Sequence, residues 1–178
     1  MSAMKKTLSE SVFDAVKENK PDTLKKLLEV DSVAHHVVDA TDESGMTPLH
    51  YASIDGFKEI VAILLAKNAT INVMNSSEWT PIHLACRGGH KEIVAMFLAK
   101  DVDHTLVNTK DGAGWTSLHH ASYRGYPEVV ALLLENNANA TVISKFGNTA
   151  LEYATEEGHD DVIALLKNNQ QGEKKWFI

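Results

Sequence analysis

The segment from Glu78 to Val94, EWTPIHLACRGGHKEIV, holds the residues of this sequence whose types and spacing could do chemistry. His83, the only cysteine of the chain at Cys86, and His90 fall within eight residues. Imidazole and thiolate groups this close can bind a metal, or the imidazole can activate the thiol as a nucleophile. One interpretation is therefore an enzyme or metal-dependent protein that uses these three residues, and the other is that they only pack.

Composition limits what the chain can be. Its 178 residues are 44% hydrophobic and 23% charged, which is ordinary for one globular domain spanning residues 1–178. The net charge of -7 argues against nucleic acid as a partner. The amino terminus lacks a signal-peptide run, and no stretch approaches the roughly 20 apolar residues of a membrane span. We expect no membrane partner and a location in the cytoplasm, with the nucleus also open.

The sequence segments that must position the histidines and the cysteine recur along the chain. Closely similar segments begin at Thr47, Thr80, Thr116 and Thr149, at offsets of 33, 36 and 33 residues. A weaker first copy, SVFDAVKENKPDTLKKLLEVD, precedes them. This periodicity predicts five repeats and a tail. Their ranges are 9–41, 42–74, 75–110, 111–143, 144–170 and, for the tail, 171–178.

Each repeat contains two short helical patterns divided by a glycine or an asparagine. Pro48 and Pro81 each follow a threonine where the first helix should begin, and Pro21 and Pro127 stand where the second should begin. The second patterns, such as KEIVAILLA, are apolar almost all round, as expected of helices that lie between neighbours. Three extra residues near Val107 to Gly112 should lengthen one connection. The pattern predicts an all-α solenoid.

The repeat pattern resembles the ankyrin repeat family over residues 9–169. The family motif D-x-x-G-x-T-P-L-H-x-A, then G-H, then V-V-x-L-L-L, is matched closely in the middle repeats. The resemblance implies stacked helix-turn-helix repeats joined by β-hairpin loops, and a monomeric, non-enzymatic module that binds another protein without a cofactor. Adaptors, inhibitors and assembly chaperones all occur in this family. The departures from the motif are Glu78, Asn68, Asn137 and Glu152.

The repeats change the meaning of the histidines. His50 and His119 occupy the place of His83 in neighbouring repeats, and three copies of a catalytic or metal-binding group are rarely needed. The resemblance implies a structural brace, whose ring bonds the threonine of its own repeat and the backbone of a neighbour. Cys86 takes the place of small residues, where a free cysteine packs as a small hydrophobe. His90 takes an aromatic place. We therefore expect no catalytic or metal-binding residue.

In the ankyrin family the partner meets the hairpin tips and the exposed side of the first helices, here called the concave face. Both arginines of the chain and two of its three tryptophans fall there. Tryptophan, tyrosine and arginine dominate binding hot spots, and arginine suits carboxylates or phosphoryl groups. The alternative for the tryptophans is local packing on the next hairpin. The predicted protein-binding residues are Met46, Ile54, Asp55, Trp79, Arg87, Trp115, Tyr123, Arg124, Phe146, Asn148 and Glu156.

Three further features stay open at this stage. The tail residues Trp176 to Ile178 either cover the last repeat or bind a partner as a chain-end motif. Asn72 resembles the ankyrin asparagine that oxygen-dependent hydroxylases modify. The acidic end of the last repeat, from Glu152 to Asp161, is either a solubilising cap or a docking patch.

Overall fold

The computed structural model describes residues 7–29 and 37–174, with side chains as far as Asn169. Its helices come in successive pairs. The pairs are α1 (Leu8–Lys17) with α2 (Pro21–Leu27), α4 (Pro48–Ile54) with α5 (Lys58–Ala66), α6 (Pro81–Gly88) with α7 (Lys91–Lys100), α8 (Ser117–Arg124) with α9 (Pro127–Glu135), and α10 (Ala150–Glu156) with α11 (Asp160–Lys174). A 3-10 turn, η1 (Leu106–Asn108), lies between α7 and α8.

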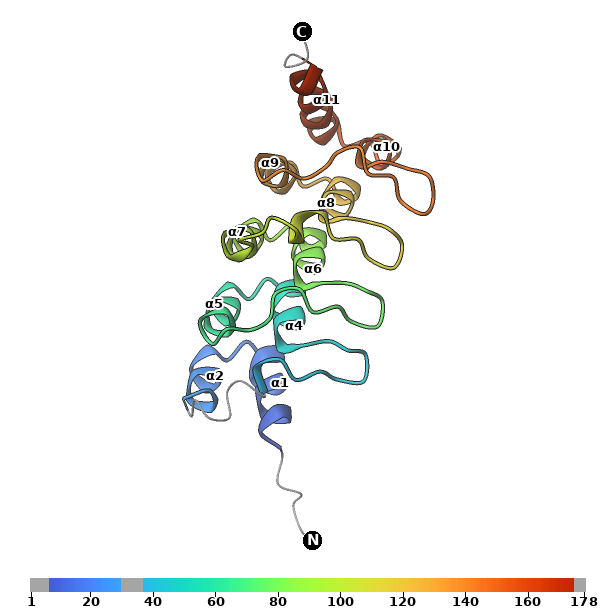
Figure 1. Ribbon diagram of the computed structural model, residues 1–178. Coiled ribbons are helices and arrows are strands. Elements are labelled where there is room, and N and C mark those ends of the chain that lie inside the picture. Colours follow the sequence, from blue (N-terminus) through green and yellow to red (C-terminus); the bar gives the residue numbers. More distant parts are fainter. Residues whose placement is uncertain (1–6, 30–36, 175–178) are drawn as a thin grey trace.

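The pairs stack into an elongated all-helical solenoid, as the sequence predicted (Figure 1). The first helices α1, α4, α6, α8 and α10 follow one another along the stack, and α4, α6, α8 and α10 pack in sequence. The second helices α2, α5, α7 and α9 form a parallel column, and the long loops project on the side of the first helices. In the described residues, no helix combines the length and the apolar character needed to cross a membrane.

The first helices begin where threonine and proline predicted. Thr47 precedes Pro48 at the start of α4, and Thr80 precedes Pro81 at the start of α6. The Thr47 hydroxyl oxygen accepts the backbone N–H of His50, three residues on, which satisfies one of the orphan donors of the first turn. Thr7 caps α1 in the same way, so the first helix starts slightly before the predicted boundary at residue 9.

Backbone positions that need a left-handed conformation are filled by residues that tolerate it. Asn19, Asn68 and Asn137 have φ of 49°, 60° and 64°. Asparagine adopts this region more readily than most residues, so these replacements of glycine keep the chain path. Glu78, which replaces the loop glycine of the third repeat, also has φ of 60°, although glutamate has no preference for the left-handed conformation.

The long loops are stacked turns, and no strand is assigned in the part of the chain that the structure describes, so the expected β-hairpins are not confirmed. Each loop closes by paired backbone hydrogen bonds, such as Asp111 N–H to Trp115 O at 2.8 Å and Gly114 N–H to Asp111 O at 2.8 Å. Each loop after the first also donates one backbone bond to the loop before it. These bonds are Ser76 N–H to Ser44 O, Gly112 N–H to Ser77 O and Lys145 N–H to Ala113 O. The loops therefore form a continuous edge of the solenoid.

The core runs between the two columns of helices. Leu49, Ile82 and Leu118 of the first helices are completely or almost completely buried. Buried residues of the second helices include Ile60, Leu64, Ile93, Phe97, Val130 and Leu133. Because each repeat covers the apolar side of the next, a single core extends along the whole stack.

The predicted position of the three extra residues is wrong. Asn68, His104 and Asn137 have positive φ and each precedes the next hairpin aspartate, asparagine or serine by the same seven residues. The insertion therefore lies at 101–103, directly after α7, and not near Val107 to Gly112. The chain absorbs it there because the turn after a second helix is exposed, whereas residues 107–112 are held by contacts with neighbouring repeats.

Candidate functional site

His83 is a structural brace between repeats. Its Nδ1 accepts the backbone N–H of Thr80 at 3.1 Å and also lies 3.1 Å from the Thr80 hydroxyl. Because Nδ1 is an acceptor, Nε2 carries the proton and donates to the carbonyl oxygen of Thr109, in the segment that leads into the next repeat, at 2.9 Å. Burial lowers the pKa of His83 to about 4, so the ring is neutral. With both nitrogens engaged, it has no lone pair left for a metal.

Cys86 and His90 have separate structural roles. The Cys86 side chain is completely buried, and burial raises the pKa of its thiol to about 12, which keeps it protonated and unreactive. His90 Nε2 bonds the carbonyl oxygen of Ile54 in the previous repeat at 3.0 Å. Its ring lies against Gly56, where a Cβ would come within 2.5 Å of His90 Cε1. The packing interpretation of the segment therefore accounts for all three residues.

The same contacts recur in full at His50 and only in part at His119, whose Nε2 is buried without a hydrogen-bond partner among the described residues. His50 Nδ1 accepts the Thr47 N–H at 3.0 Å, and its Nε2 donates to the Trp79 carbonyl at 3.0 Å. His119 Nδ1 accepts the Thr116 N–H at 3.1 Å, and burial lowers the pKa of His119 to about 4.

The two outermost first helices carry glutamate where the internal ones carry histidine. Glu10 accepts the Thr7 N–H at 2.7 Å, and Glu152 accepts the Thr149 N–H at 2.6 Å. In the last repeat no further repeat follows within the described chain, so a side chain that only accepts is sufficient there. The departure at Glu152 therefore preserves the helix cap while omitting the link to a neighbour.

His120, the second histidine of the fourth repeat, has a buried partner that the sequence analysis did not predict. His120 Nε2 donates to Asp111 Oδ2 at 2.9 Å, and both side chains are almost fully buried. Burial lowers the pKa of His120, against the raising effect of Asp111. Burial alone would raise the pKa of Asp111, but hydrogen bonds from His120 and two backbone amides hold it below its usual value. The pair is therefore a carboxylate and a neutral imidazole.

A nine-residue spacing would have revealed this pair. In three repeats, the residue at the start of the long loop bonds a residue of the first helix nine positions further on. The pairs are Asp42 with Tyr51, Asp111 with His120, and Ser144 with Tyr153. In the third repeat the same positions hold Asn75 and Leu84, and leucine cannot make the bond. The signal is a polar residue at each hairpin start matched to a polar residue nine positions on.

The two predicted tryptophans lie half-buried over this pair. The Trp79 ring is 4.4 Å from the His120 ring, centroid to centroid, and the Trp115 ring is 5.0 Å from it. Trp115 also contacts Tyr153 at 4.5 Å and Tyr123 at 5.4 Å. These rings form one continuous floor across the third, fourth and fifth repeats. The tryptophans thus pack locally and still present part of their surface.

Of the two arginines, Arg87 lies on the aromatic floor, and Arg124 lies at the end of the next first helix, α8. The Arg87 guanidinium is 5.1 Å from the Trp79 ring centroid, which is a cation–π contact. Arg87 and Arg124 are exposed, and among the described residues neither has an acidic partner in an ion pair. Both positive charges lower the pKa of His120, so they act on the same small region.

The other predicted binding residues line the same face with differing exposure. Ile54, Asp55, Tyr123, Phe146 and Glu156 are exposed, whereas Met46 and Asn148 are half-buried at hairpin tips. Asn148 donates its amide to Glu156 at 2.8 Å, which fixes this acidic group beside the last hairpin. The interpretations of Trp176 to Ile178 fall outside the described residues.

Comparison with known protein families identifies the class of protein. The chain matches the family described as ankyrin repeats (3 copies) over residues 12–111 and 102–175. The chain therefore belongs to the ankyrin repeat family, in which these repeats are generally protein–protein interaction modules. A search of curated proteins found no match.

Proposed function

We propose that this protein is a non-enzymatic interaction module that acts as a monomer in the cytoplasm or nucleus and binds a partner protein on its concave face. Neither nucleic acid nor a membrane is its partner. Such a surface serves an adaptor, an inhibitor or an assembly chaperone equally. The observation that carries the proposal is that Arg87 lies on the aromatic floor and that neither Arg87 nor Arg124 has an acidic partner among the described residues.

The arginine pair is unusual for this chain. The net charge is -7 and the sequence has only two arginines, yet both lie on adjacent first helices away from acidic side chains. An unpaired guanidinium on the Trp79 ring is already oriented and is weakly hydrated, so its planar donors can meet a carboxylate or a phosphoryl group at small entropic cost. This geometry favours an acidic group on the partner.

The charges at the two ends of the concave face limit the partner further. Asp55 lies in the repeat before Arg87, and Glu156 and Glu157 lie in the repeat after Arg124. A partner segment that carries an acidic residue at its centre and basic residues on either side would match this order of charges. A uniformly acidic segment would be repelled at both ends.

The enzymatic alternative has no chemical support in these residues. The neutral His83 ring uses both nitrogens, and the Cys86 thiol is buried and protonated. Neither group is available as a base, a nucleophile or a ligand. The interaction module is therefore the function that the geometry favours.

The test is a cross-linking capture from extract of the host cell with matched variants. The charge reversal Arg87→Glu with Arg124→Glu should lose the partner that the natural chain retains. The control Lys58→Glu with Lys91→Glu makes the same change of charge at exposed positions of α5 and α7 and should retain it. Circular dichroism verifies that each variant is folded. Retention of the same proteins by the arginine variant and the natural chain would overturn the proposal.

A further inference from the structure

Asparagine or aspartate at one position of the loop after the second helix joins successive repeats. Asp39 accepts the backbone N–H of Thr70 at 2.9 Å and its hydroxyl at 2.6 Å. Asn108 accepts the backbone N–H of Asn139 at 2.8 Å and donates its amide to the Asn137 carbonyl at 3.1 Å. In both cases the bonded amide lies 31 residues further along the chain.

Asn72 occupies the equivalent position in the second repeat but lacks this link. With the three inserted residues counted, the amide that corresponds to Thr70 N–H and Asn139 N–H is that of Leu106. Leu106 N–H instead donates to Oδ2 of Asp101, the first residue of the insertion, at 2.9 Å. The Asn72 side chain is exposed and has no hydrogen bond to any residue in the described ranges 7–29 and 37–174.

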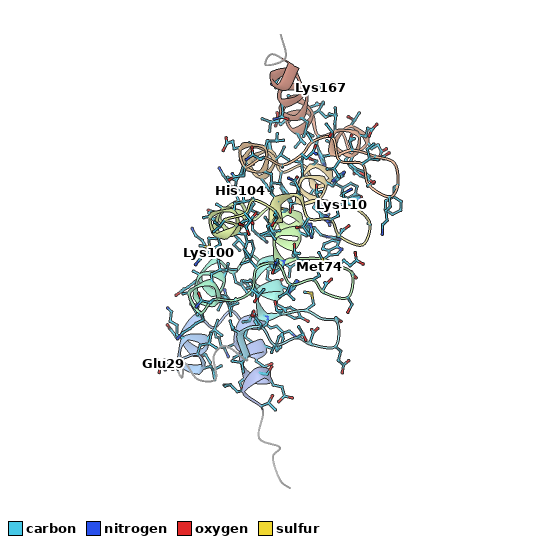
Figure 2. The ribbon with its side chains drawn as sticks, in the orientation of Figure 1. Glu29, Met74, Lys100, His104, Lys110 and Lys167 are labelled. Carbon is cyan, nitrogen blue, oxygen red and sulfur yellow. The ribbon has the colours of Figure 1, made fainter. Side chains whose placement is uncertain are left out.

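A hollow opens beside the unused amide. It has a volume of about 380 Å³ and adjoins a second hollow of about 310 Å³, and the two share Ile71, Asn72 and Lys100. Together they form a groove along the loops of the second and third repeats. Figure 2 labels Met74 and Lys100, which line it from the segment before α6 and from the end of α7.

The groove has apolar walls that are open to contact. Met74 is 46% exposed and Val102, in the insertion, is 85% exposed. Ile71 and the almost fully buried Leu106 complete the apolar lining, and Lys100, Asp103, Thr105 and Thr109 add polar groups. The floor is polar, because Asp101 lies there with only 7% of its surface exposed. A bound chain would therefore find apolar contacts for a side chain next to a free amide group.

We propose that this groove binds an extended peptide segment of a partner protein, with Asn72 bonding its main chain. The side-chain amide of Asn108 shows the arrangement, because its oxygen receives a backbone N–H and its nitrogen donates to a backbone carbonyl. The peptide takes the place that the loop of the next repeat occupies at the other interfaces. An apolar side chain of the peptide rests on Met74 and Val102. This site is separate from the arginines of the concave face.

The test uses a phage-displayed library of random seven-residue peptides. The library is first depleted on the Asn72→Ala chain and then selected on the natural chain, so that only peptides that need Asn72 survive. We expect survivors that bind the Asn72→Ala chain about tenfold more weakly, because a pair of hydrogen bonds is lost. In nuclear magnetic resonance spectra, they should shift the side-chain amide signal of Asn72.

Two controls separate this site from the others. Asn108→Ala removes the same residue type at the equivalent position and should leave peptide binding unchanged, since its partner is internal. Arg87→Glu with Arg124→Glu should also leave it unchanged, so failure here is distinct from failure of the concave-face proposal. Methylation of the peptide nitrogen that meets Asn72 should abolish binding.

Deletion of residues 101–103 gives a second readout. Without the insertion, Leu106 N–H should return to Asn72, which closes the groove and removes peptide binding. The proposal is overturned if no peptide survives selection, if survivors tolerate methylation at every nitrogen, or if the Asn72 amide signal does not move. Because Asn72 is exposed, Asn72→Ala folds, and the result does not depend on the deletion.

Discussion

The first helices carry two rows of side chains that differ in kind. The inner row, His50, His83 and His119, repeats the same residue, and each ring is buried and bonds the threonine of its own repeat. The outer row, Ile54, Arg87, Tyr123 and Glu156, changes at every repeat and is exposed. Positions that repeat therefore hold the stack together, and positions that vary are available for recognition.

The physical cause of this difference is the environment at each position. An inner position is buried beside backbone carbonyls, which the rings of His50 and His83 bond, so the same residue type suits it in each internal repeat. An outer position faces solvent and is free to differ. Stability should therefore respond to the inner row and partner affinity to the outer row. Four predictions test this separation, beginning with the largest expected change in stability.

Lowering the pH should destabilise the folded protein through the histidines of the inner row. The folded-state pKa of His83 and of His119 is lowered to about 4, whereas an unfolded histidine titrates near 6.5. The unfolded chain binds more protons, so stability is present above pH 6.5 and is lost as the pH falls from 6.5 toward 4. The free energy of unfolding should drop by about 4 kcal/mol between pH 7 and pH 5, about 2 for each ring. Urea unfolding at both pH values measures it.

A control for this prediction removes one of the rings. His83→Gln should reduce the dependence of stability on pH by about half, whatever it does to stability at pH 7. The same unfolding free energy at pH 5 and pH 7 for the natural chain would show that the inner histidines are not held neutral by burial.

His120 lies below the outer row and should behave as an inner residue. His120→Leu leaves the buried Asp111 carboxylate without its imidazole donor, and we expect it to lower the unfolding free energy by about 3 kcal/mol. The double variant Asp111→Asn with His120→Leu recreates the combination that Asn75 and Leu84 already form in the third repeat. It should cost about 1 kcal/mol or less. Equal losses in the two variants, by urea unfolding, would mean that the uncompensated charge is not the cause.

Tyr123 stands at the boundary between the rows. Its ring is 37% exposed and contacts both Trp115 and Tyr153 edge-on. Tyr123→Ala should lower the unfolding free energy by about 1 kcal/mol through lost ring contacts and should also weaken partner binding. Tyr123→Phe keeps the ring and is the matched control for stability. If Tyr123→Ala changed neither quantity, the aromatic floor would contribute nothing at this point.

Much of the fold was predictable because it depends on local chemistry that repeats. The threonine–proline starts, the asparagines at left-handed positions and the histidine braces each have copies elsewhere in the chain, so comparison among repeats reveals their roles. The position of the insertion was not predictable, because 101–103 and 107–112 are equally polar in sequence. Only the backbone conformation of His104 shows where the repeat resumes.

The candidate site was predictable in part. Which residues are exposed on the first helices follows from the repeat, and so do the places of Arg87 and Arg124. The buried Asp111–His120 pair was missed because its nine-residue spacing joins a hairpin to a helix, which no helical or strand periodicity covers. That the Asn72 amide is free could not be predicted from the sequence either, because it depends on which side chain accepts the Leu106 N–H.

The outer row should show the smallest change in stability and the clearest change in binding. Arg87→Ala and Arg124→Ala should each alter the unfolding free energy by about 0.5 kcal/mol or less, because both side chains are exposed and only the contact of Arg87 with Trp79 is lost. Each should reduce the binding free energy of the captured partner by about 2 kcal/mol, which is roughly thirtyfold in affinity, as loss of a central hot-spot residue does. Titration calorimetry beside urea unfolding measures the two effects. A large loss of stability with unchanged affinity would place the arginines in the inner row, and the separation between fold and recognition would then fail at the position that defines it.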